Sequence, residues 1–228
     1  LTLLPQSAFA AMSDRSPVFG ESIYFGAGEA YMGVNNHSTF VDSTFFPYVR
    51  THSHDPFATN VFIGYGYEFS SHIYLGAEAL GIFIQDPGFG TGSTPPANTG
   101  SRLRARQAYG FDVLYGYVIS PCFLAYFRTG MMWAKYTRDN FLSPGGQIQQ
   151  HGPRSYVAGV PALRIGAGLS WAFAGKWVLS ADYAYITTQK FSMTYFSEDN
   201  ITLAVPETAL AHPIYNVVSL SLSYRITI

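Results

Sequence analysis

The stretch from Tyr109 to Tyr136 alternates apolar residues with small or polar ones along almost its whole length, interrupted only near Ser120-Pro121. Before the interruption, the apolar side chains share one face of an extended chain: Tyr109, Phe111, Val113, Tyr115, Tyr117 and Ile119. After it, the alternation resumes through Trp133. A period of two residues is typical of a strand with different environments on its two faces. The stretch therefore predicts two strands joined by a tight turn.

The chemistry of the two faces is the inverse of that expected for a soluble sheet. The apolar face carries Tyr and Trp, whereas the opposite face mixes small residues with Asp112 and Arg128. Only 12% of the chain is charged, about half of the roughly 25% usual in soluble domains. No run of about 18 apolar residues is present, which excludes a transmembrane helix from the sequence pattern. We therefore expect a barrel in a lipid bilayer, apolar outside and polar or small inside.

The rest of the chain repeats this pattern. With the two strands above included, strands are predicted at about 21–34, 59–69, 73–85, 102–120, 123–138, 155–173, 177–191 and 213–228. Long polar connections are predicted at about 35–57, 86–101, 139–154 and 192–212, and they alternate with short turns. An even number of strands lets the first pair with the last and removes both sheet edges. The predicted fold is all-β, a transmembrane eight-stranded antiparallel up-and-down barrel. The register of the first strand stays open, because inward Glu29 would also place Phe25 and Tyr31 inward.

The N-terminal residues resemble the end of a secretory signal. Ala8-Phe9-Ala10 fits the small-x-small pattern before a cleavage site. We expect residues 1–10 to be a remnant of a signal peptide, and residues 11–228 to form a single barrel domain; a short disordered arm is the alternative. The net charge of −1 shows no basic footprint for nucleic acid.

Charged residues recur on the predicted inner face: Glu68, Glu78, Asp112, Arg128, Arg164, Asp182 and Arg225. The interior of an eight-stranded barrel is just wide enough for side chains to fill it, and charges away from water require partners. These residues therefore predict a structural ion-pair network, with a gated path for ions as the alternative. Arg102, Arg104 and Arg106 are predicted to continue this inner face to the outer rim. There they would bind lipopolysaccharide phosphates or pair within the lumen.

Sites for chemistry are not predicted. His37, His52, His54 and Asp55 fall in one polar connection, but their spacing is not a zinc pattern. No Gly pair completes a nucleotide-binding fingerprint, and no nucleophile has an oriented base. We expect no catalytic, cofactor-binding or metal-binding residues. A barrel enzyme that modifies lipid A is the less favoured alternative.

Several segments resemble a known family. Two segments are similar to hairpins of the eight-stranded OmpA, OmpX and Opa-like outer-membrane barrels, namely GYGYEFSSHIYLGAEALG and IGAGLSWAFAGKWVLSADYAY. A third segment, YFRTGMMW, is similar to a strand of the same family. Tyr224, Ile226 and Ile228 resemble the C-terminal signal read by the barrel-assembly machinery, although that signal usually ends in Phe.

The resemblance implies an integral protein of the bacterial outer membrane that contacts its lipids and lipopolysaccharide. Both termini are expected in the periplasm, on the side of the short turns. The expected role is non-enzymatic: structural, or adhesion and ligand contact through surface-exposed loops that bind a host or surface ligand. A narrow porin-like channel is the alternative.

Overall fold

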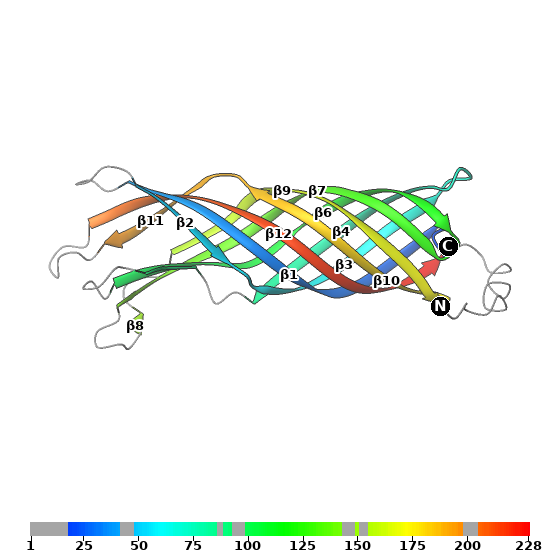
Figure 1. Ribbon diagram of the computed structural model, residues 1–228, viewed down its shortest axis with the longest axis horizontal. Coiled ribbons are helices and arrows are strands. Elements are labelled where there is room, and N and C mark those ends of the chain that lie inside the picture. The colour runs from blue at the N-terminus through cyan, green and yellow to red at the C-terminus, as the bar shows by residue number, and fades with distance from the viewer. Residues whose placement is uncertain are drawn as a thin grey trace, which may run out of the picture.

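The computed structural model describes residues 18–41, 48–85, 89–92, 99–142, 149–150, 155–197 and 205–228. Figure 1 shows their strands wound into one elongated barrel, with the short turns at one end and the long connections at the other. We call these the short-turn end and the long-connection end. No helix in the described part of the chain is long and apolar enough to cross a bilayer. The expected signal remnant, residues 1–10, lies outside the described residues.

Eight long strands form the wall, each antiparallel to its neighbours. They are β1 (Ser22–Val41), β3 (Phe57–Glu68), β4 (Ile73–Gln85), β6 (Thr99–Ser120), β7 (Phe123–Leu142), β9 (Ser155–Ala174), β10 (Trp177–Thr188) and β12 (Val205–Thr227). Strand β1 pairs with β12 along its whole length, from Ser22–Thr227 to Val41–Thr208, and this pairing closes the barrel. The predicted eight-stranded antiparallel up-and-down barrel is confirmed.

Four short strands lengthen the wall at the long-connection end: β2 (Tyr48–His54), β5 (Phe89–Gly92), β8 (Gln149–Gln150) and β11 (Phe191–Ser197). They pair with β1, β6, β7 and β12, so each extends the ladder of a wall strand. The four connections predicted as loops are therefore partly strand, and that prediction was wrong in its boundaries. The apolar alternation used to predict strand ends stops where the strands extend beyond the lipid. Main-chain hydrogen bonds to a neighbouring strand continue past that point, so the strands are longer than the alternation indicates.

The two faces of the wall follow the predicted alternation. In β6, Tyr109 and Tyr115 are exposed on the outside while Asp112 and Leu114 are buried inside. The open register of β1 is resolved in the same way, since Tyr24, Ala30 and Met32 are buried and Ile23, Phe25 and Tyr31 are exposed. Glu29 therefore points outward, where its Oε1 accepts a hydrogen bond from Thr59 Oγ1 at 2.9 Å.

A β-bulge reverses the alternation at the long-connection end of β6. The register against β7 shifts between Ala105 and Gln107, which leaves Arg106 as the extra residue. Leu103 and Ala105 are buried, with 9% and 2% of their surface exposed, whereas Arg106 is exposed. Because an extra residue exchanges the two faces, Arg104 and Arg106 lie on the outer side. The predicted inward direction of these arginines was wrong; the side chain of Arg102 lies outside the described set.

Side chains fill the interior in three layers. Nearest the short turns, Phe19 and Tyr74 pack with Leu114, Leu124 and other apolar residues. A charged layer follows, and beyond it an apolar core extends toward the long connections. The large interior rings fit because glycines face them: a Cβ on Gly64 or Gly66 would overlap Tyr24 or Tyr74.

Candidate functional site

Five inward side chains meet in the middle of the lumen, and we call them the charged layer. They are Glu78, Asp112, Arg128, Arg164 and Asp182, from β4, β6, β7, β9 and β10. These strands are consecutive in the wall. Strand alternation therefore brings their inward positions to neighbouring points of one curved surface.

Two guanidinium groups hold three carboxylates in this layer. Arg128 lies 3.4 Å from Glu78, 3.3 Å from Asp112 and 3.6 Å from Asp182. Arg164 Nη1 donates to Asp112 Oδ2 at 2.8 Å, and its Nη2 lies 3.5 Å from Asp182 Oδ1. Asp112 is fully buried and Arg164 is 3% exposed. Charges this far from water persist because each has an opposite charge in contact.

Hydroxyl groups complete the shell around two of the carboxylates. Ser219 Oγ donates to Asp182 Oδ2 at 2.8 Å, and Tyr24 hydroxyl donates to Glu78 Oε1 at 3.1 Å. These donors come from β12 and β1, so the closing pair of strands also supports the layer. The layer is a chain of contacts that crosses the lumen.

Two of the predicted network members lie elsewhere. Arg225 sits among aromatic rings nearer the short turns, with its guanidinium carbon 4.4 Å from the ring centre of Tyr24 and 5.0 Å from that of Phe19. It also donates to Tyr74 hydroxyl and Ser22 Oγ at 3.2 Å. Glu68 instead contacts His72 Nδ1 at 3.2 Å, beside a short turn.

Aromatic residues close the short-turn end of the lumen, and the sequence analysis missed them. Phe19 is fully buried and packs edge-on against Tyr74, with ring centres 6.4 Å apart. Arg225 stacks over both rings, which is a favourable cation–π arrangement. Tyr24 then links this cluster to the charged layer through Glu78. An available signal was the alternation of Gly64 and Gly66 on β3, the strand between β1 and β4, which leaves room for such rings.

Toward the long connections, the lumen is apolar and nearly solid. A small cavity of about 20 Å³ lies there, lined by Met32, Ile82, Met132, Ile186 and other residues. This volume is about that of one water molecule, and an apolar cavity of that kind stays dry. The hydroxyls of Tyr136 and Tyr215 meet at 2.7 Å between β7 and β12, which are not neighbours in the wall.

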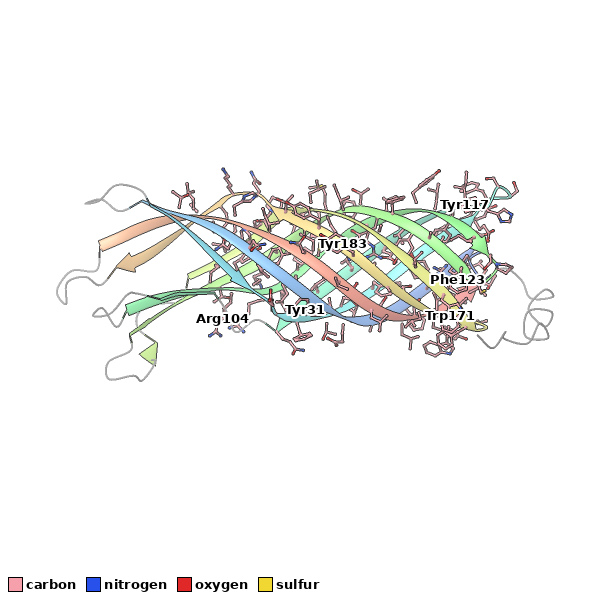
Figure 2. The ribbon with its side chains drawn as sticks, viewed as in Figure 1. Tyr31, Arg104, Tyr117, Phe123, Trp171 and Tyr183 are labelled. Carbon is pink, nitrogen blue, oxygen red and sulfur yellow. The ribbon has the colours of Figure 1, made fainter. Side chains whose placement is uncertain are left out.

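Two of the arginines that were predicted to face the lumen lie on the outer surface instead. Arg104 and Arg106 are on the outer side near the long-connection end, where Figure 2 shows Arg104. Aromatic side chains ring the short-turn end, where Figure 2 shows Tyr117, Phe123 and Trp171. Among the described residues, no group of His, Cys, Asp or Glu could hold a metal ion. The side chains of His37, His52 and His54 lie outside that described set.

Several solved structures align with most of this chain. OprG of Pseudomonas aeruginosa aligns over 92% of this chain and 97% of its own, with 8% identity and a TM-score of 0.55. The attachment invasion locus protein Ail of Yersinia pestis aligns over 88% and 99%, with 15% identity and a TM-score of 0.38. The protease OmpT of Escherichia coli aligns over 90% and 97%, with 10% identity and a TM-score of 0.43. At 8% identity, the alignment with OprG shows the fold alone.

No curated protein matches the sequence, but a family model matches almost the entire chain. The family model described as outer membrane protein beta-barrel domain matches residues 1–225. It agrees with the closed wall, the apolar outer face and the resemblance to OmpA-like barrels. The chain therefore belongs to the outer membrane protein beta-barrel family, and it is a barrel of the bacterial outer membrane.

Proposed function

We propose that this protein is a non-enzymatic outer-membrane barrel whose lumen is closed to ions. Its role is to supply a rigid wall and to present the long connections outside the cell, where they contact a host or surface ligand. The short turns and both termini face the periplasm in this proposal, as in bacterial barrels with short periplasmic turns.

The observation that supports a closed lumen is the charged layer. Arg128 and Arg164 each contact Asp112 and Asp182, so an ion could pass only if several contacts opened together. Ring packing around Phe19 lies on one side of the layer and the apolar core on the other. An ion that has lost its water shell finds no polar contacts to replace it in either apolar region. Each region therefore adds a further barrier to ion passage.

Conductance in planar lipid bilayers tests this proposal. The refolded wild-type barrel, shown to be closed by a heat-dependent shift in gel mobility, should give no steady open current. Glu78→Gln should leave the bilayer equally tight, because the aromatic and apolar layers remain. Glu29→Gln is the matched control, since it removes the same charge from the outer face. A wild-type current that changes with Glu78→Gln but not with Glu29→Gln would establish the narrow channel instead.

The non-enzymatic part of the proposal has its own test. Lipid A extracted from cells that express the protein should have the same mass as lipid A from cells that lack it. A new acylated or deacylated species would show that the barrel is a lipid A-modifying enzyme. The closed-lumen test is unaffected by this result.

A further inference from the structure

An apolar hollow lies on the outer, lipid-facing side of the wall across β3, β4, β6 and β7. Its volume is about 580 Å³, and Val61, Ile63, Ala79, Gly81, Tyr109 and Trp133 are among the residues that line it. Ala79 and Gly81 are small outward residues of β4 that line it. We call it the Gly81 hollow.

Two cations stand directly beyond this hollow, toward the long-connection end. Tyr109 pairs with Trp133, and the next outward pair along the same two strands is Gln107 with Lys135. Lys135 is exposed, and the bulged residue Arg106 beside Gln107 is exposed as well. The bulge is therefore what adds an arginine to this outer patch, because unbroken alternation would have turned Arg106 into the lumen.

Among the described side chains of β4, β6 and β7, no carboxylate shares the outer face with these cations. The carboxylates of these described residues are Glu78 and Asp112, and both are buried inside the barrel. The rings of Tyr109 and Trp133 stack with centres 6.1 Å apart, between the cations and the hollow. Tyr and Trp concentrate at the boundary between lipid and water in outer-membrane barrels. At that boundary, the cations would lie at head-group level and the apolar hollow at acyl-chain level.

We propose that the Gly81 hollow and the cations Arg106 and Lys135 together bind a phosphorylated glycolipid of the lipopolysaccharide type. Its phosphate contacts the two cations, and one of its acyl chains lies over Ala79 and Gly81. The assignment to the outer leaflet rests on the proposed orientation of the barrel. It does not depend on whether the lumen conducts ions, so the two proposals can fail separately.

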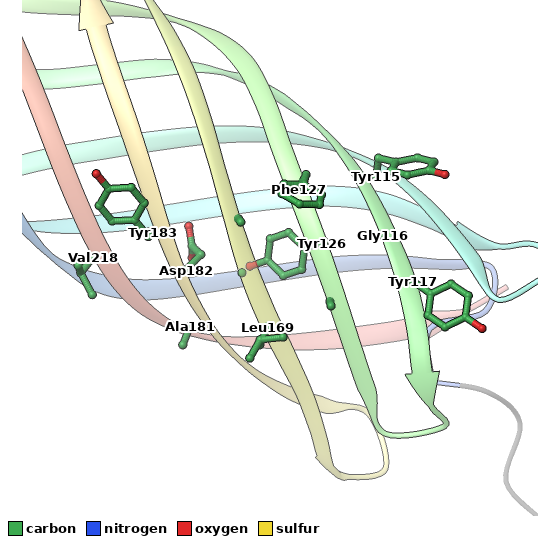
Figure 3. A pocket seen from close by; sticks show the side chains of 13 residues that line it. Tyr115, Gly116, Tyr117, Tyr126, Phe127, Leu169, Ala181, Asp182, Tyr183 and Val218 are labelled. Atoms are coloured by element: carbon green, nitrogen blue, oxygen red, sulfur yellow. The ribbon is translucent and has the colours of Figure 1, made fainter.

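A second hollow on the same outer face provides an internal control. Figure 3 shows it between Tyr115 and Tyr183, and its volume is about 610 Å³. Ala125, Ala167 and Ala181 line it as small outward residues. The next outward row toward the long connections holds Thr129, Ile165, Tyr185 and Asn216, without a cation. This Ala167 hollow offers an acyl chain the same kind of apolar surface, but the described row beyond it provides no cation for a phosphate.

Native mass spectrometry of the detergent-refolded barrel with purified lipid A tests the site. The double variant Arg106→Gln/Lys135→Gln should weaken binding about tenfold or more, because charge-assisted hydrogen bonds to the phosphate are lost. Gly81→Leu should weaken it by filling the hollow. A Cβ at Gly81 would lie 3.6 Å from Val61 Cγ2, so the backbone need not move. Ala79→Val is a second filling variant if Gly81→Leu does not refold.

Controls identify what is recognised. Lys176→Gln removes an exposed charge at a short turn, and Ala167→Leu fills the other hollow. Neither should change lipid A binding. Inorganic phosphate alone should not compete, whereas dephosphorylated lipid A should bind weakly. The proposal is wrong if the control variants weaken binding as much as the site variants do, or if free phosphate competes as well as lipid A.

Discussion

The charged layer and the apolar core occupy neighbouring lengths of one lumen, yet they fill it in different ways. In the charged layer, each carboxylate has a particular guanidinium or hydroxyl partner, as Asp182 has Arg164 and Ser219. In the apolar core, Met32, Ile82 and their neighbours only need to occupy the available volume. The first arrangement depends on direction and charge, and the second depends on packing density. Loss of one member should therefore cost more in the charged layer than in the core.

Arg164→Ala should have the largest effect on stability. The substitution removes the 2.8 Å contact to Asp112 and the 3.5 Å contact to Asp182, and it leaves Arg128 to balance all three carboxylates of the layer. Removing one partner of a buried ion pair costs about 3–5 kcal/mol. Urea unfolding in lipid vesicles, followed by tryptophan fluorescence, measures this loss. Lys176→Ala, an exposed control, should change the free energy of unfolding by less than about 0.5 kcal/mol.

Met132→Ala should cost less, about 2–3 kcal/mol, which is the lower part of the range for such truncations. Met132 is 1% exposed and borders the existing cavity, so flexible neighbours such as Met32 can partly fill the space. Met132→Leu keeps most of the volume and should cost less than about 1.5 kcal/mol. The comparison of the two halves fails if Met132→Ala proves more destabilising than Arg164→Ala in the same vesicles.

Tyr136→Phe should have the smallest effect, about 1 kcal/mol, because it removes one neutral hydrogen bond and keeps the packed ring. Tyr215→Phe should behave alike. Their double variant should cost less than the sum of the single variants, since both singles remove the same 2.7 Å contact. Strictly additive losses would show that this contact does not couple β7 to β12.

The faces of the wall could be predicted because alternation is a local property. Tyr109, Asp112 and Leu114 lie on the predicted sides, since lipid and lumen select different residue types at successive positions. Strand ends were predicted less well. Strands β2 and β11 contain polar residues of the kind found both in loops and in strand pairs exposed to water. Composition therefore could not distinguish a strand from a loop there.

The bulge at Arg106 reverses the faces that alternation predicts for this end of β6. Its neighbours on both sides alternate normally, and nothing in RLRARQ marks the position of the extra residue. Only the pairing with β7 locates it. The shift nevertheless decides whether Arg104 and Arg106 face the lumen or the outer surface, and so whether an outer cation patch exists.

By itself, the sequence determined the architecture, the polarity of the wall and the inward direction of Glu78, Asp112, Arg128, Arg164 and Asp182. The tertiary structure decided which of these charges meet. Asp112 and Arg164 are 52 residues apart in the chain and come within 2.8 Å, while Arg225 is surrounded by aromatic rings instead. Alternation sets only the side of a strand that each residue faces. Contacts across the lumen depend on the register of every ladder around the closed barrel, which no single segment encodes.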